Sequence, residues 1–127
     1  MERQTVPAQS SFADRVGYSR AVRVGNHVFV AGTAPIMPDG ERPPDDVFKQ
    51  AQRCLEIIVA ALAEVGASPE HVVRTRIYLI NADDIGDVGR AHGHVFRDVK
   101  PVTSAIVVTE LLDPAWLVEI EAEAIVP

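Results

Sequence analysis

Residues 45–80 read DDVFKQAQRCLEIIVAALAEVGASPEHVVRTRIYLI, and this stretch decides the fold. In its first part, apolar residues recur at steps of three and four, which predicts one buried face of an α-helix from about Asp45 to Val65. Gly66 is suited to end that helix. The run Val72–Ile80 is rich in β-branched residues and predicts a strand. The apolar face of the helix consists of Phe48, Ala51, Leu55, Ile58, Leu62 and Val65.

Two further strands precede the helix. Ser19–Val24 and His27–Gly32 alternate apolar and polar residues, and Gly25-Asn26 between them is typical of a tight hairpin turn. Residues 1–17 are expected to be irregular. The second strand, the long helix and the strand after it form a crossover, which predicts that these two strands run parallel.

A weaker helix and two strands follow. We expect the helix from Ala82 or Asp84 to Phe96, and strands at Thr103–Thr109 and Leu117–Val126. The order β-β-α-β-α-β-β predicts an α+β fold with both helices on one face of a mixed sheet. The other sheet face is then open and is expected to be rich in Val, Ile, Phe and Leu. Such a face predicts an oligomer whose subunits pack sheet against sheet.

Composition restricts the class of protein. The chain has 127 residues, 47% of them apolar, and a net charge of −6, which predicts a single globular domain over residues 1–127. The acidic balance disfavours nucleic acid as a partner. No stretch resembles a signal peptide or a membrane span, so we expect a cytoplasmic protein without a membrane partner. Cys54 is the one cysteine, which excludes an intramolecular disulfide, and we expect it in the core.

The strand at Leu117–Val126 carries an unusual pattern of charge. Its even-numbered positions are apolar, whereas Glu119, Glu121 and Glu123 share the other face. Three like charges on one face repel unless water or cations lie nearby. One interpretation is a solvated face. The other is that one glutamate lines a cleft as a general base or a water-positioning group, where burial would raise its pKa.

The histidines do not predict a metal site. His92 and His94 are two positions apart on the expected helix, so their rings point in very different directions and cannot share an ion. We expect His92 to be an interior, hydrogen-bonded side chain. Nothing in the sequence indicates a metal or another cofactor.

Several segments, in order, resemble one known family. Val16-Gly17-Tyr18-Ser19 is similar to that family's Gly-Pro-Tyr, and Phe29–Pro35 stands where it has Ser-Gly-Gln-x-Pro. Pro101-Val102-Thr103-Ser104 and Val118–Ala122 are similar to its Pro-x-Arg-Ser and Ile-Glu-Ile-Glu-Ala. From about Tyr18 to Val126, the chain therefore resembles the RidA (YjgF) family.

The resemblance implies a fold, an assembly and an activity. The fold is chorismate-mutase-like, and the assembly is a homotrimer with three sites in the clefts between subunits. The activity is cofactor-independent hydrolysis of small 2-imino or 2-enamino acids to 2-keto acids and ammonia. Carried over by position, Glu119 is the catalytic residue that positions water. The binding residues would be Tyr18, Ala31, Gly32, Thr33, Phe96, Thr103 and Ala105.

The chain departs from the family pattern at the residue that would bind the substrate carboxylate. Thr103 replaces the arginine, and a threonine cannot make the bidentate charged contact, a loss on the order of 2–5 kcal/mol. Two hypotheses remain: a divergent deaminase-type hydrolase for a substrate without the usual carboxylate, or a non-catalytic trimer that binds a small molecule. A ribonuclease is disfavoured by the net charge. The residues that could replace the lost guanidinium are Arg20, Arg90 and Arg97.

Overall fold

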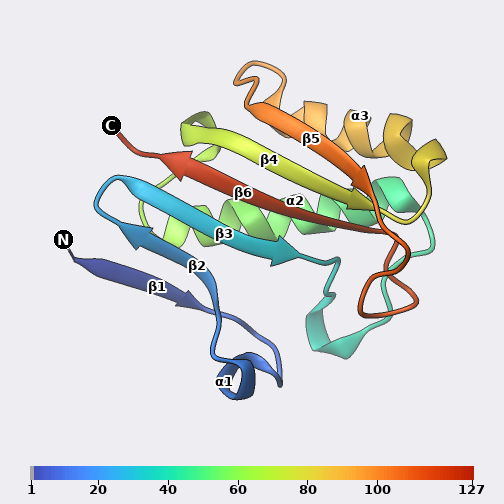
Figure 1. Cartoon of the computed structure of the whole chain (residues 1–127), viewed down its shortest axis with the longest axis horizontal. Helices are drawn as coiled ribbons and strands as arrows, with labels where there is room; N and C mark the ends of the chain where they lie inside the picture. The colour runs from blue at the N-terminus through green and yellow to red at the C-terminus, as the bar shows by residue number, and fades with distance from the viewer. Residues whose placement is uncertain (1) are drawn as a thin grey trace.

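The strands form one mixed sheet in the order β1-β2-β3-β6-β4-β5, as Figure 1 shows for the computed structural model, which describes residues 2–127. Neighbouring strands are antiparallel except for β4 and β5, which are parallel. No helix in the described part of the chain is long and apolar enough to cross a membrane. The strands are β1 (Arg3–Pro7), β2 (Ser19–Val24), β3 (His27–Thr33), β4 (Val72–Leu79), β5 (Val102–Val107) and β6 (Val118–Ile125).

Both long helices, α2 (Val47–Glu64) and α3 (Ile85–Phe96), cover the same face of this sheet (Figure 1). The Asp46 side chain accepts a hydrogen bond from the backbone N–H of Lys49 and caps α2 at its start. Gly66, at a φ of 78°, lies just beyond its end. The predicted mixed sheet with helices on one face is therefore confirmed. The shorter helices are α1 (Ala13–Val16) and the 3₁₀ turns η1 (Pro38–Gly40), η2 (Pro69–His71) and η3 (Ala82–Asp84).

The last strand in chain order occupies the middle of the sheet. β6 lies between β3 and β4 and is antiparallel to both, so β3 and β4 run parallel to each other, as predicted, without touching as neighbours. The even-numbered residues of β6 pack against α2 and are almost completely buried. The sheet face that carries Glu119 is thus the face away from the helices.

The expectation that residues 1–17 are irregular was wrong. β1 pairs antiparallel with β2 at the sheet edge, and Val6 is only 5% exposed. Since Val6 is the one buried residue of this strand, alternation within it is too short to give a signal, and the strand is defined by its pairing with β2. The remaining differences are shifts of one or two residues at the ends of elements.

The open sheet face differs from the apolar surface expected from sequence. Its centre is charged, because Arg76 and Tyr78 on β4 face the glutamates of β6 across the strand pair. Apolar side chains remain to either side, including Phe29 on β3 and Ile106 on β5, which are 50% and 40% exposed. This face therefore combines a polar centre with apolar flanks.

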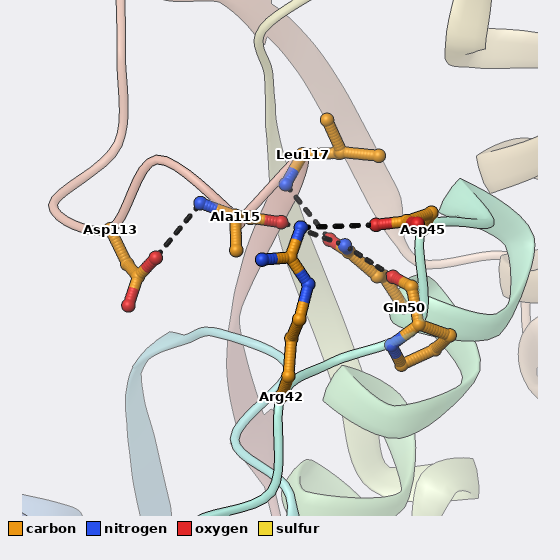
Figure 2. Close-up of polar contacts among 7 residues, drawn as sticks. Arg42, Asp45, Gln50, Asp113, Ala115 and Leu117 are labelled. Carbon is orange, nitrogen blue, oxygen red and sulfur yellow. Dashed lines mark hydrogen bonds and ion pairs between the residues drawn. The ribbon is translucent and has the colours of Figure 1, made fainter.

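A buried amide joins α2 to the loop that leads into β6. Gln50 is fully buried, and its Nε2 donates to the carbonyl oxygens of Pro44 at 2.8 Å and Ala115 at 2.9 Å. Its Oε1 accepts from the backbone N–H of Leu117 at 2.8 Å, as Figure 2 shows. Because Leu117 directly precedes β6, this side chain fixes where the strand begins.

Candidate functional site

Glu119 differs from the other two glutamates of β6 in its surroundings. Its side chain is half-buried, and burial raises the pKa of its carboxyl above the usual range. The positive charge of Arg20 opposes this shift, and the negative charge of Glu121 adds to it. Among residues 2–127, no cation lies within 4 Å of the Glu119 carboxylate.

The carboxylates of Glu121 and Glu123 pair with a cation of the same chain. Nη1 of Arg76 lies 3.1 Å from Oε1 of Glu121 and 3.4 Å from Oε1 of Glu123. The hydroxyl of Tyr78 also donates to Glu121 at 2.7 Å. A simple solvated face therefore does not describe these two glutamates, because the neighbouring strand supplies their cation. Glu119 is left as the carboxylate of β6 that is available to a ligand.

A bulge in β3 brings Gly32 against Glu119. Val30 pairs with Ala122 and Thr33 pairs with Ile120, so β3 has one extra residue opposite β6 at this point. A methyl group placed on Gly32 would lie 2.5 Å from Oε2 of Glu119, closer than two such atoms can approach. The carboxylate thus occupies space that only glycine leaves open.

Arg20 lies on the other side of the same bulge. Its Nη2 donates to the carbonyl oxygen of Gly32 at 2.7 Å. Its charge influences the pKa of Glu119, while burial lowers the pKa of Arg20 itself. Tyr18, which is 39% exposed, lies close enough to raise the pKa of Arg20. Of the arginines left open by the sequence, Arg20 is therefore the one near Glu119.

The other two arginines lie elsewhere. The guanidinium of Arg90 stacks on the ring of Phe48 at 3.9 Å and pairs with Asp87 on the same helix. Arg97 follows α3, where one of its terminal nitrogens is near Gly93. Both therefore belong to the helical side of the molecule.

Thr103 belongs to a separate group of polar side chains. Its hydroxyl lies 2.7 Å from that of the buried Thr75, which in turn lies 2.9 Å from Nε2 of His92. His92 is thus an interior hydrogen-bonded histidine, as predicted, and burial lowers its pKa. Its ring contacts Phe96, with 4.7 Å between the centroids, and Phe96 is buried in the core.

The residues predicted for one site fall into two groups. Glu119 pairs with Tyr78 on β4, whereas Thr103 pairs with Thr75, three residues away on the same strand. An odd separation places the two side chains on opposite faces, and it adds about 10 Å along the strand. The first group consists of Tyr18, Ala31, Gly32 and Glu119. The second group consists of Phe96, Thr103 and Ala105. Thr33 belongs to neither group, because it is buried and its hydroxyl donates to the carbonyl oxygen of Ala31.

Sequence reasoning missed Arg76, Tyr78 and Thr75 as neighbours of the site residues. Arg74, Arg76 and Tyr78 alternate with buried residues in β4, and this alternation was the signal that they share one face. Their pairing with β6 was not visible, because the two strands are separated by α3 and β5 in the sequence. Cys54 is buried in the core as predicted, and burial raises the pKa of its thiol.

The comparisons with known proteins all lead to one family. The sequence model of the family described as endoribonuclease L-PSP matches residues 8–126. A RutC family protein of Pyrococcus abyssi is 39% identical over 108 residues, which is 84% of each chain. The crystal structure of a YjgF/YER057c/UK114 family member from Mycobacterium tuberculosis is 43% identical with a TM-score of 0.90, and the match covers 98% of this chain and 100% of that one. The crystal structure of E. coli TdcF with bound serine is 25% identical with a TM-score of 0.82, and the match covers 97% of this chain and 94% of that one.

Proposed function

Because the chain belongs to the YjgF (RidA) family, also described as endoribonuclease L-PSP, we propose that it is a cofactor-independent hydrolase of small imines or enamines. The observation that carries the proposal is the state of Glu119, a half-buried carboxylate with a raised pKa that no cation of the described chain neutralises within 4 Å. Such a group is a stronger base than an ordinary glutamate.

The chemistry needs only water and this carboxylate. Water adds to the imine carbon while Glu119 takes one of its protons and passes it to the imine nitrogen, which gives a carbinolamine. Glu119 then takes the hydroxyl proton of the carbinolamine and passes it to the nitrogen as the carbon–nitrogen bond breaks, so the nitrogen leaves as ammonia and the carbonyl forms. The sum is one imine and one water converted to one carbonyl compound and one ammonia, and Glu119 ends as it began.

A site between subunits accounts for the two separated groups. Thr103 and Glu119 lie on opposite faces within one chain, so only a second copy could bring a Thr103 group up to a Glu119 group. Thr103 lies on the exposed edge strand β5, which could meet the open sheet face of the next copy, where Phe29 is exposed. The serine bound in TdcF supports an amino-acid-sized ligand for a cleft of this kind. The acidic chain, at a net charge of −6, argues against RNA as the substrate.

The assay that tests the proposal measures ammonia release from imines that are generated in situ in the reaction mixture. The panel includes neutral and aromatic imines as well as 2-imino acids, because Thr103 offers no charged contact for a carboxylate. We expect faster release than in the buffer control for at least the neutral members. No acceleration across the panel, with ligand binding retained, would favour the non-catalytic binding trimer instead.

Assembly is tested by sedimentation. We expect a species of three times the 13.8 kDa subunit mass, because the proposed site needs residues from two copies. A monomer at assay concentrations would contradict the inter-subunit site, whether or not the protein binds ligand.

The acidic limb of the pH–rate profile should lie at a higher pH than an ordinary glutamate would give. The active form is the Glu119 carboxylate, and its pKa is raised, so activity should fall on acidification at a higher pH than for an ordinary glutamate. Arg20→Gln removes the charge that lowers this pKa and should move the acidic limb to still higher pH. The measurement is the pH profile of kcat/KM for both proteins, with Arg42→Gln as the control. A shift toward lower pH in Arg20→Gln would contradict the assignment.

Gly32→Ala should separate activity from stability. The added methyl displaces the end of a flexible side chain, so the free energy of unfolding should change by less than about 1 kcal/mol. The displaced Glu119 carboxylate should lower kcat by about tenfold or more, since small misplacements of a catalytic group are costly. Gly89→Ala is the matched control, because a methyl group there meets nothing within 4 Å. An unchanged kcat in Gly32→Ala would show that Glu119 is not the catalytic residue.

A further inference from the structure

A cavity of about 250 Å³ lies between α2 and the segment that contains the end of β1 and the start of β2. Its wall includes Tyr18 and Arg20 from one side and Arg53, Ile57 and Ala60 from the helix. Glu119 is not part of this wall, whereas Tyr18 and Arg20 lie near both, so the cavity adjoins the proposed catalytic site without including its base. This volume is many times what one water needs, so the cavity admits a small organic ligand.

Arg20 reaches this cavity without an ion pair among residues 2–127, although Glu119 is near enough to influence its pKa. Nη2 donates to the Gly32 carbonyl, but Nε is buried and has no hydrogen-bond partner. The ion pairs among residues 2–127 do not include Arg20. A partly buried guanidinium without a counter-ion is costly, and an anion beside it removes that cost.

The other charges of the cavity wall do not take this place. Arg53 donates from Nε to the Ile36 carbonyl and pairs with Glu56 at 3.6 Å, so those two charges offset each other. Glu64 is exposed and lies two helical turns beyond Ile57, about 10 Å along the helix. The apolar part of the wall comes from Val6, Pro7, Ile36, Ile57, Ala60 and Ala61.

We infer that this cavity is a second small-molecule site, which binds a carboxylate with a short apolar tail, anchored by Arg20. The carboxylate accepts from the terminal nitrogens of the guanidinium, since Nε is shielded from the cavity. The tail lies against Ile57 and Ala60. The inference does not rest on the proposed hydrolysis, because Glu119 takes no part in it.

The test uses isobutyrate, its neutral isostere isobutyramide, and inorganic phosphate as probes, with binding followed by amide NMR shifts. We expect isobutyrate to bind at least tenfold more tightly than the other two and to shift the signals of Tyr18 and Ala60. Arg20→Gln should weaken isobutyrate binding at least tenfold, whereas Arg42→Gln, an arginine outside the cavity, should leave it unchanged.

Two further variants keep the test decisive. Ala60→Phe alters an exposed wall residue, so the fold should tolerate it, and the larger side chain should block isobutyrate. Glu119→Gln should bind isobutyrate at least as tightly as the wild type, because it removes a negative charge near Arg20, whereas it should abolish most of the hydrolysis. Equal binding of acid and amide, tighter binding of phosphate, or full binding by the Arg20→Gln or Ala60→Phe protein would overturn the inference.

Discussion

Replacing Glu119 with glutamine is expected to lower the rate of imine hydrolysis by about 100- to 10,000-fold, the usual contribution of a general base. Glutamine keeps the size of the side chain but cannot take a proton from water. The substrate should still bind, because the amide fills the same space beside Gly32. The loss should therefore appear in kcat with little change in KM.

The same variant should fold at least as well as the wild type. The pKa of Glu119 is raised in the folded state by burial, so the ionised carboxylate costs stability above that pKa, and the cost disappears as the pH falls through it. Glutamine has no charge to bury. Thermal unfolding at neutral pH should thus show an unchanged or higher Tm.

Glu121→Gln is the matched control on the same strand face. Glu121 accepts from Arg76 and Tyr78, so its loss disturbs a polar cluster but removes no proposed catalytic group. We expect near-normal kcat and at most a modest loss of stability. If Glu121→Gln loses activity as strongly as Glu119→Gln, the catalytic role belongs to the cluster and not to Glu119.

Gln50→Met should destabilise the fold by about 3–5 kcal/mol and lower Tm by roughly 10 °C or more. Methionine fills a similar volume but leaves the Pro44 and Ala115 carbonyls and the Leu117 N–H without partners (Figure 2). Each unsatisfied buried group costs about 1–3 kcal/mol. Because the loop leads into β6, the position of Glu119 should also loosen and kcat should fall.

Gln50→Glu tests the direction of these hydrogen bonds. A carboxylate can accept from Leu117 but cannot donate to the two carbonyls, so we expect a loss of stability comparable to that of Gln50→Met at neutral pH. Gln52→Glu, an exposed position in the same helix, should change the free energy of unfolding by less than about 0.5 kcal/mol. Denaturant unfolding measures all three. A stable Gln50→Met protein would show that the loop is held by other contacts.

Local pattern was enough to predict most elements of the fold. The helical steps of α2, the hairpin between β2 and β3 and the alternation of β6 are properties of adjacent residues, and each prediction held. β1 was missed because one buried residue, Val6, leaves no pattern. The insertion of β6 between β3 and β4 depends on pairing between segments that are distant in the sequence, and local periodicity does not predict such pairing.

In the candidate site, too, local pattern predicted part of the arrangement, and the rest depends on contacts between distant segments. Alternation placed Glu119, Glu121 and Glu123 on one face but could not rank them. The ranking comes from Arg76, which lies 45 residues before Glu121 in the sequence and is brought opposite it by strand pairing. Similarly, nothing local distinguished Arg20 from Arg90, whereas the bulge at Gly32 and the stacking on Phe48 do.

The central position of β6 has a consequence for the order of folding during synthesis. The strand that fills the gap between β3 and β4 is the last of the six to leave the ribosome. Until it arrives, both of those strands present unpaired edges, and the apolar side of α2 has no central strand to cover. The nascent chain must therefore stay in a partly formed state for most of its synthesis. Its protection from misassociation in that period depends on how quickly the final segment inserts.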